Sequence, residues 1–319
     1  MQPDVSFIIA AFNAEGSIAR AIQSALDQRG VMVEVIVVDD CSSDRTVDVA
    51  RSFPAEQVRV VALAKNRGPG GARNEGLAVA EGRWVAMLDS DDTVYPERLA
   101  RLIARAQRAG AEIAVDNLDV VREATGASEP MFTPALLERL QQMTLADFIA
   151  SNLMFERTFS FGYMKPVIER RFVEENALRY PETLRIGEDY VFLASALAKG
   201  GRCIVEPQPR YAYHIRAGSI SRVLELHHVE AMLAADAAFL REHQLDAAAK
   251  IAQARRTRSL KEAAAFLALV KHLKDRAPLK AIAMAISRPS ALRHLRMPIA
   301  ARLRRLARPF EARALGQSA

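Results

Sequence analysis

The chain has 319 residues, half of them apolar and 26% charged, which is typical of a globular protein and excludes a disordered or collagen-like one. Two cysteines, Cys41 and Cys203, are too few for a disulfide framework or a cysteine-rich zinc site, so we expect a reducing cytoplasm as the compartment. The longest apolar runs are about six residues, against the ~20 needed to cross a bilayer. We therefore expect no membrane-spanning segment.

The formal net charge of +6 is distributed unevenly along the chain. Residues 255–319 contain 16 Lys or Arg residues and three acidic residues, whereas residues 1–254 contain 28 basic and 35 acidic residues. A basic tail on a mildly acidic body argues against nucleic acid as a partner. It indicates instead that the tail contacts anionic lipid or another acidic surface.

The first 120 residues alternate between strand and helix patterns. Short apolar runs predict strands at residues 5–10, 33–38, 58–63, 84–88 and 112–116. Helical spacing of apolar residues predicts helices at 17–28, at 46–53, after the glycine-rich stretch 66–74, and from Pro96 onward. This alternation predicts an α/β fold with a mostly parallel sheet flanked by helices, in which ligands bind beyond the carboxyl ends of the strands.

Acidic residues follow three of these predicted strands. If the strands are parallel, their carboxyl ends share one rim of the sheet, and we expect the acids to converge there. The alternative is that aspartates at these positions only cap helices and begin turns. The residues concerned are Asp39 and Asp40, Asp89 and Asp91, and Asp116.

The rest of the chain is less regular and then becomes helical. Residues 122–160 are mixed, with a short helix near 145–149, and are followed by helices at 169–176 and 188–199 and a strand at 205–214. From residue 229 the composition shifts toward Ala, Leu, Lys and Arg with helical periodicity. We therefore predict an α/β domain at residues 1–225 and a helical, basic C-terminal extension at residues 226–319.

The sequence Asp89-Ser90-Asp91 places two carboxylates on one face of an extended strand end. Carboxylate oxygens suit Mg²⁺ or Mn²⁺, and these ions usually share their coordination shell with phosphate oxygens. The pattern therefore indicates a diphosphate–metal site. Taken alone, D-x-D is a weak signal, because it occurs by chance in many chains of this length.

The glycine-rich stretch contains Gly68, Gly70 and Gly71, which would let a loop approach a ligand closely. It lacks the G-x-x-x-x-G-K-[ST] sequence, and Arg73 replaces the third glycine of G-x-G-x-x-G. A P-loop or dinucleotide fold is therefore disfavoured. A plain glycine-rich turn into a helix is an equally good interpretation.

Five motifs in a fixed order resemble those of a known family. The order over residues 4–220 is similar to that of family 2 glycosyltransferases, which have a GT-A fold with a Rossmann-like nucleotide-binding sheet. Residues 116–121, 162–172 and 213–226 more specifically resemble the glucosyltransferases of succinoglycan-type exopolysaccharide assembly. The motifs are Ala11-Phe12-Asn13, Val38-Asp39-Asp40, Asn66-Arg67-Gly68 through Arg73-Asn74, Leu88-Asp89-Ser90-Asp91-Asp92 and Gly187-Glu188-Asp189-Tyr190.

The resemblance implies roles for individual residues. Asp91 would hold the divalent metal, Asp189 would be the catalytic base, and Glu188 would support the base or the acceptor. Residues 1–120 would form the nucleotide-sugar-binding half, and residues 121–225 the acceptor and catalytic-base half. The donor-binding residues would be Ala11, Asn13, Asp39, Asp40, Arg73, Asn74, Asp89, Ser90, His214 and Arg216.

The resemblance also implies a reaction. It would be an inverting transfer of a sugar, from UDP-glucose, to a lipid-linked oligosaccharide in exopolysaccharide biosynthesis. Mg²⁺ or Mn²⁺ would neutralise the charge that develops on the leaving diphosphate. A carboxylate base would take the proton of the acceptor hydroxyl, which is a poor nucleophile at neutral pH.

Residues 288–313 contain eight arginines, one glutamate and apolar residues at helical spacing. This pattern predicts an interfacial helix on anionic lipid, which would attach the enzyme to the inner face of the cytoplasmic membrane. The alternative is a basic helix packed on the body, or a loose terminus.

Two other functions remain open from the sequence. Asp89 through Thr93 also fits D-x-D-x-[TV], the nucleophile loop of haloacid-dehalogenase-type phosphatases, although that loop usually follows the first strand and not the fourth. The other alternative is a nucleotide-sugar-binding protein without catalysis, against which the presence of both Asp91 and Asp189 argues.

Overall fold

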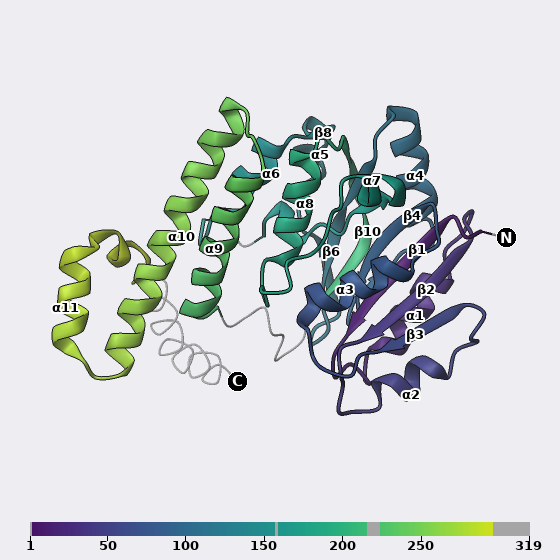
Figure 1. Cartoon of the computed structure of the whole chain (residues 1–319), viewed down its shortest axis with the longest axis horizontal. Coiled ribbons are helices and arrows are strands. Elements are labelled where there is room, and N and C mark those ends of the chain that lie inside the picture. The colour runs from purple at the N-terminus through teal and green to yellow at the C-terminus, as the bar shows by residue number, and fades with distance from the viewer. Residues whose placement is uncertain (1, 157–158, 216–223, 296–319) are drawn as a thin grey trace, which may run out of the picture.

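The computed structural model describes residues 2–156, 159–215 and 224–295 (Figure 1). Arg216 and the tail beyond residue 295 lie outside the described residues, so their expected roles stay predictions. No helix in the described ranges combines the length and apolar character required to cross a bilayer.

A mixed sheet forms the centre of the molecule, and its strand order in the described residues is β3-β2-β1-β4-β9-β6-β10-β5, with β7 beside β6 and β8 beside β10. The first four strands of this order are parallel, as the sequence predicts. They are β1 (Val5–Ala11), β2 (Val33–Asp39), β3 (Val58–Ala62) and β4 (Trp84–Asp89). The others are β5 (Thr93–Val94), β6 (Ile113–Arg122), β7 (Ala127–Pro130), β8 (Gln142–Met143), β9 (Val167–Glu169) and β10 (Cys203–Ile215).

Helices pack on the sheet, and a group of three further helices forms one end of the molecule (Figure 1). α9, α10 and α11 lie at the end of the molecule away from β2 and β3 (Figure 1). The helices of the α/β part are α1 (Ile18–Leu26), α2 (Thr46–Arg51), α3 (Gly68–Val79), α4 (Arg98–Ala109), α5 (Pro134–Arg139), α6 (Leu145–Ser151), α7 (Arg170–Glu175) and α8 (Glu188–Ala198), with a 3-10 turn η1 (Phe161–Tyr163). The extension contains α9 (Leu226–Glu242), α10 (Ala247–Lys274), α11 (Pro278–Ser287) and the 3-10 segment η3 (Pro289–Leu295).

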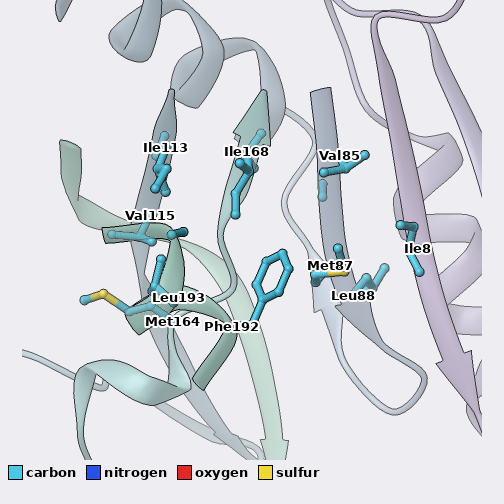
Figure 2. Close-up of a cluster of buried hydrophobic side chains, with 14 of the residues drawn as sticks. Ile8, Val85, Met87, Leu88, Ile113, Val115, Met164, Ile168, Phe192 and Leu193 are labelled. Carbon is cyan, nitrogen blue, oxygen red and sulfur yellow. The ribbon is translucent and has the colours of Figure 1, made fainter. Parts of the chain in front are cut away.

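The hydrophobic core covers both faces of the central strands, and one part of it lies between these strands and α8. Ile8 of β1, Met87 of β4 and Ile113 of β6 are buried, and Phe192 of α8 is buried among the same cluster (Figure 2). Trp84 is 2% exposed, which agrees with the expected packing role of the only tryptophan. Because β1 and β4 are covered on both faces, they are continuous apolar runs, which is the pattern of a buried parallel strand.

The glycine-rich stretch does not form an extended ligand loop, because α3 already begins at Gly68. A Cβ on Gly76 would lie 2.4 Å from Cγ2 of Ile8, and one on Gly70 would lie 2.8 Å from the carbonyl oxygen of Pro181. These glycines let α3 pack closely on β1 and on the segment before α8. The interpretation of this stretch as a turn leading into a helix is therefore closer to the structure.

Asp116 does not lie at the rim where the sequence placed it. The predicted strand 112–116 continues to Arg122, so Asp116 is in the middle of β6. It is fully buried, and its two oxygens accept hydrogen bonds from Arg98 at 2.9 and 2.8 Å. The expectation that three strand ends carry converging acids is wrong for this residue, because a buried arginine on α4 satisfies its charge.

Arg256 of α10, which is paired with Asp236 inside the helical extension, connects the extension to the α/β part. Asp236 of α9 lies 3.0 Å from Nε of Arg256 on α10. The Arg256 guanidinium stacks on the Tyr190 ring of α8 at 3.5 Å, and its Nη1 donates to the carbonyl oxygen of Asn152 at 2.6 Å. Residues of α9 and α10 belong to the same hydrophobic cluster as the sheet, so the groups of elements on either side of residue 225 share one core.

The Arg98–Asp116 pair yields a test of stability. We expect Asp116→Ala to lower the free energy of unfolding by about 3–5 kcal/mol, because it leaves the buried Arg98 charge without a partner. Urea denaturation followed by circular dichroism measures this. The matched control is Glu97→Ala, which removes the half-exposed ion pair with Arg101 and should cost about 0–1 kcal/mol. Equal losses in the two variants would contradict the assigned role of Asp116.

Candidate functional site

The carboxyl ends of β1, β2 and β4 meet at one edge of the sheet. In the strand register Ala11 is opposite Asp39, and Ala10 is opposite Asp89. Three of the predicted motifs therefore lie on neighbouring strand ends, as the parallel-sheet argument required. This edge is where a ligand of such a sheet binds.

Arg73 connects the end of β4 to the start of α8. Its Nη2 lies 2.8 Å from Oδ1 of Asp89, and its Nη1 lies 2.7 Å from Oε1 of Glu188 and 3.2 Å from Oδ1 of Asp189. The guanidinium is buried and approaches the Tyr180 ring at 5.4 Å. Residues that are about one hundred positions apart in the sequence are thus joined in one ion cluster.

Lys165 is the second cation of this cluster, and the sequence analysis did not identify it. Its Nζ lies 2.8 Å from Oδ2 of Asp89 and 2.6 Å from Oδ2 of Asp189. It precedes Pro166 and β9 in a stretch without a recognisable spacing signal, within residues 162–172 that carried the closer family resemblance. We refer to Arg73, Lys165, Asp89, Glu188 and Asp189 as the ion cluster.

The charges of the ion cluster shift the pKa values of its members. Burial would raise the pKa of Asp89, but Lys165 and Arg73 hold it well below its usual range. Burial and the charge of Asp189 raise the pKa of Glu188, although Arg73 opposes this. Both acids of α8 lie in its first turn, where the positive end of the helix dipole favours carboxylates.

α8 can begin at this position because Gly187 precedes it with a φ of 94°, a conformation that side-chain-bearing residues rarely adopt. A Cβ there would also come within 3.3 Å of Met232 on α9. The backbone turn at Gly187 therefore directs Glu188 and Asp189 toward Arg73.

The acids at the end of β2 differ from each other. Asp40 accepts hydrogen bonds from the backbone N–H groups of Arg67 and Gly68 at 2.6 and 2.8 Å, which fixes the start of α3. Burial raises its pKa, and these two N–H groups partly offset the effect. Asp39 accepts from the N–H of Ser42, and its buried Oδ1 has no hydrogen-bond partner among the residues that the structure describes. A buried oxygen of this kind is suited to accept from a ligand.

Other expected binding residues have structural partners within the fold. Asn13 has a φ of 50°, and its Oδ1 accepts from the N–H of Ser43 at 2.9 Å. Asn74 binds both backbone groups of Tyr180, at 2.8 and 2.9 Å, and so ties α3 to the segment before α8. Ser90 lies in the turn after β4, beside the ion cluster in sequence.

Asp92, the residue after Asp91, is a buried carboxyl that connects the D-x-D segment to His214. Asp92 accepts from the Tyr211 hydroxyl and from the N–H of His214, both at 2.8 Å. The Tyr211 hydroxyl in turn accepts from the N–H of Asp89 at 3.2 Å. Tyr211 and Asp92 therefore hold β10 against the D-x-D segment, a role that the sequence pattern alone did not reveal. His214 Nε2 is 3.0 Å from Oγ1 of Thr93.

The residues that the structure describes form no protein cage for a divalent metal, and the metal-ligand role of Asp91 stays a prediction. In the described ranges no group of three His, Cys, Asp or Glu side chains is arranged to hold a metal ion. The oxygens of Asp89 bind Arg73 and Lys165, and those of Asp92 bind Tyr211 and His214. A site with one carboxylate, water and substrate phosphates suits Mg²⁺, which is often bound by one or two carboxylates and phosphate oxygens.

Sequence comparisons identify similar proteins. Residues 6–172, just over half of the chain, match the family model described as glycosyl transferase family 2. Succinoglycan biosynthesis protein ExoO of Rhizobium meliloti is 59% identical over 97% of this chain and 88% of its own, and ExoU of the same organism is 33% identical over 81% and 76%. The UDP-Glc:alpha-D-GlcNAc-diphosphoundecaprenol beta-1,3-glucosyltransferase WfaP of Escherichia coli is 26% identical over 68% and 79%.

Among solved structures, S. aureus TarS residues 1–349 in complex with UDP resembles this chain with a TM-score of 0.64. The alignment covers 91% of each chain at 20% identity. At that identity the likeness concerns the fold alone.

Lys165 provides a test of the ion cluster. We expect Lys165→Met to lower the free energy of unfolding at neutral pH by about 1–3 kcal/mol, because two half-buried carboxylates lose a buried cation that binds both of them. The folded-state pKa of Asp89 lies below its unfolded value of ~3.9, so its contribution is present above that pH and is lost as the pH falls. The difference between wild type and variant should therefore narrow on acidification.

Urea denaturation at neutral and acidic pH measures this difference. The control is Lys250→Met on α10, where the described residues offer the exposed lysine no ion pair. A loss of stability in Lys165→Met that is small or independent of pH would show that Lys165 does not stabilise the carboxylates.

Proposed function

Because this chain belongs to glycosyl transferase family 2, we propose that it transfers a sugar from a nucleotide-sugar donor to a lipid-linked oligosaccharide during exopolysaccharide biosynthesis. Family membership and the GT-A fold confirm the resemblance expected from the five motifs. The observation that carries the proposal is the ion cluster, in which Arg73 and Lys165 join Asp89 of the D-x-D segment to Asp189 of α8.

The donor in this proposal is UDP-glucose, bound over the ends of β1, β2 and β4. Two similar proteins support this choice: the name of WfaP includes UDP-Glc, and TarS has been solved in complex with UDP. The unpartnered Oδ1 of Asp39 would accept the N–H of a uracil base. Asp40, Asn13 and Asn74 would shape the surrounding loop, and the remaining donor contacts would come from Ala11, Arg73, Asp89, Ser90, His214 and Arg216.

Asp91 would hold Mg²⁺ or Mn²⁺ against the two phosphates of the donor. When bound, the cation neutralises the charge of the departing nucleoside diphosphate. The buried Asp92–Tyr211 hydrogen bond fixes the backbone on which Asp91 lies, so this chain would supply one oriented carboxylate to the site.

Asp189 would act as the general base. The acceptor hydroxyl oxygen forms a bond to the anomeric carbon on the face opposite the diphosphate, and the bond between that carbon and the diphosphate oxygen breaks. The hydroxyl proton passes to the Asp189 carboxylate, and the electron pair leaves with the nucleoside diphosphate. Attack on the opposite face inverts the anomeric configuration. Glu188, held by Arg73, would orient the acceptor or the base.

We further propose that the acceptor is presented at a membrane. The name of WfaP includes a diphosphoundecaprenol acceptor, which supports a lipid-linked acceptor here. The basic C-terminal region would attach the protein to the inner face of the cytoplasmic membrane, where such an acceptor would lie within reach.

The alternatives from the sequence find less support. A phosphatase would need Asp89 as a nucleophile, but this chain belongs to a different family, glycosyl transferase family 2. The presence of both Asp91 and Asp189 argues against a binding protein without catalysis. Incubation with UDP-sugars, Mn²⁺ and a phosphatase substrate separates the three functions by release of UDP, release of phosphate, or binding alone.

Asp189→Asn tests the general base. We expect turnover to fall about 10²–10⁴-fold while UDP binding is retained, because the amide preserves the shape but does not accept the proton. Release of UDP from UDP-glucose, with a lipid extract supplying the acceptor, measures turnover, and calorimetry measures binding. Asp48→Asn on the exposed face of α2 is the control. Unchanged turnover in Asp189→Asn would remove the base assignment.

Asp91→Ala tests the metal ligand. Calorimetric titration of UDP with and without Mn²⁺ should show tighter binding with the cation in the wild type, and this dependence should disappear in the variant. Asp48→Ala should behave as the wild type does. If Mn²⁺ still strengthens UDP binding to Asp91→Ala by the same factor, Asp91 does not hold the metal.

A further inference from the structure

α11 lies at the outer end of the helical extension (Figure 1) and carries an exposed apolar stripe. Leu279, Ile282 and Ile286 are 81%, 56% and 75% exposed. Their spacing of three and four residues places them on one face of the helix. The opposite face is used for folding, because Ala281 is buried against Leu269 of α10. The stripe is therefore not needed to hold α11 on the molecule.

The chain on both sides of this stripe contains several basic residues and almost no acidic ones. Asp275 is the only acidic residue of residues 263–295. The basic residues that are close to the stripe in the sequence form no ion pair within the part that the structure describes. No acidic side chain there neutralises their charge. These residues are Lys271, Lys274, Arg276, Lys280 and Arg288.

A cationic hollow lies next to the end of α11. It has a volume of about 550 Å³ and is bounded by α10 and η3, with Arg288 directly after α11 among its lining residues. Lys250, Arg258 and Lys261 also line it, against one carboxylate, Glu262. The hollow adds a place for a phosphate group to the same end of the molecule.

The charge decides between possible occupants of the stripe. The tail at residues 296–319 contains six arginines and one glutamate, so it would bring further positive charge onto a cationic surface. A second copy of the chain that paired through the same face would also bring positive charge onto this cationic surface. An anionic bilayer supplies both an apolar layer for the stripe and phosphates for the cations.

We propose that α11 docks in the plane of an anionic lipid bilayer, with Leu279, Ile282 and Ile286 inserted at the boundary between headgroups and acyl chains. Lys274, Arg276 and Lys280 contact lipid phosphates around them. The ten residues of α11 extend about 15 Å, too short to span a bilayer, so the helix lies on it. This inference rests on the lipid-linked acceptor of the proposed function and names the surface that meets the lipid.

Vesicle flotation of the full-length protein tests the inference. Wild type should float with vesicles that contain phosphatidylglycerol and remain unbound with pure phosphatidylcholine. The triple variant Leu279→Gln/Ile282→Gln/Ile286→Gln should lose at least about tenfold in partition coefficient, because each side chain forfeits apolar burial. The matched control replaces three exposed apolar residues elsewhere, Met32, Leu136 and Ile251, with Gln and should bind as the wild type does.

A second variant keeps the test informative if the first one is poorly folded. Lys274→Gln/Arg276→Gln/Lys280→Gln should weaken binding to anionic vesicles and leave the thermal midpoint unchanged. Wild-type flotation by both triple variants, or no flotation by the wild type, would overturn the proposal. Loss of flotation only in Arg302→Gln/Arg304→Gln/Arg305→Gln would assign lipid binding to the tail instead.

Two further measurements separate this inference from its alternatives. Light scattering that shows a wild-type dimer, converted to a monomer by the apolar triple variant, would identify a second copy as the occupant and overturn lipid docking. Calorimetric UDP binding should be equal in wild type and both α11 variants. Failure of UDP binding in the wild type would count against the proposed function, whereas failure of flotation alone would count against α11.

Discussion

The structure depends on the neutralisation of buried charge where the two halves of the α/β part meet. Two cations, Arg73 from α3 and Lys165 from the segment before β9, hold three carboxylates from β4 and α8. Separating any member would leave a charge in a site with little water, which costs several kcal/mol. The N-terminal half of the α/β part, which contains the parallel strands β1 to β4, is thereby fixed against the half that carries Asp189.

Packing of α3 makes this arrangement possible. Glycines allow the helix to approach β1 and the backbone at Pro181, which brings Arg73 to a buried position between strand and helix. Asn74, the next residue, fixes the Tyr180 segment by two hydrogen bonds and so fixes the path of the chain into α8. The same short helix therefore orders the motif at Asp40, through its first N–H groups, and the acids of α8.

Much of this could be predicted from the sequence, because the parallel strands are continuous apolar runs and the polar motifs follow them in order. The error at Asp116 arose because a strand that carries a buried, paired acid has the same local pattern as a strand that ends there. Lys165 was missed for a related reason. The role of Lys165 depends on Asp189 and Asp89, which are more than twenty and more than seventy residues away in the sequence. No local periodicity predicts such contacts. Tyr211 and Asp92 illustrate the same limit across an even longer separation.

The stacking of Arg256 on Tyr190 limits where this enzyme can be joined to a relative in a chimera. The segment by which the family is recognised ends at residue 172, yet Tyr190 adjoins Asp189, and Arg256 reaches it from α10. A chimera that joined the recognised segment to a foreign C-terminal half would replace Asp189, one of the two carboxylates that bind Lys165, and would also remove the stacking of Arg256 on Tyr190. Exchange of the C-terminal half therefore requires transplanting α6 through α10 as one block, because Arg256 also donates to the carbonyl oxygen of Asn152 directly after α6.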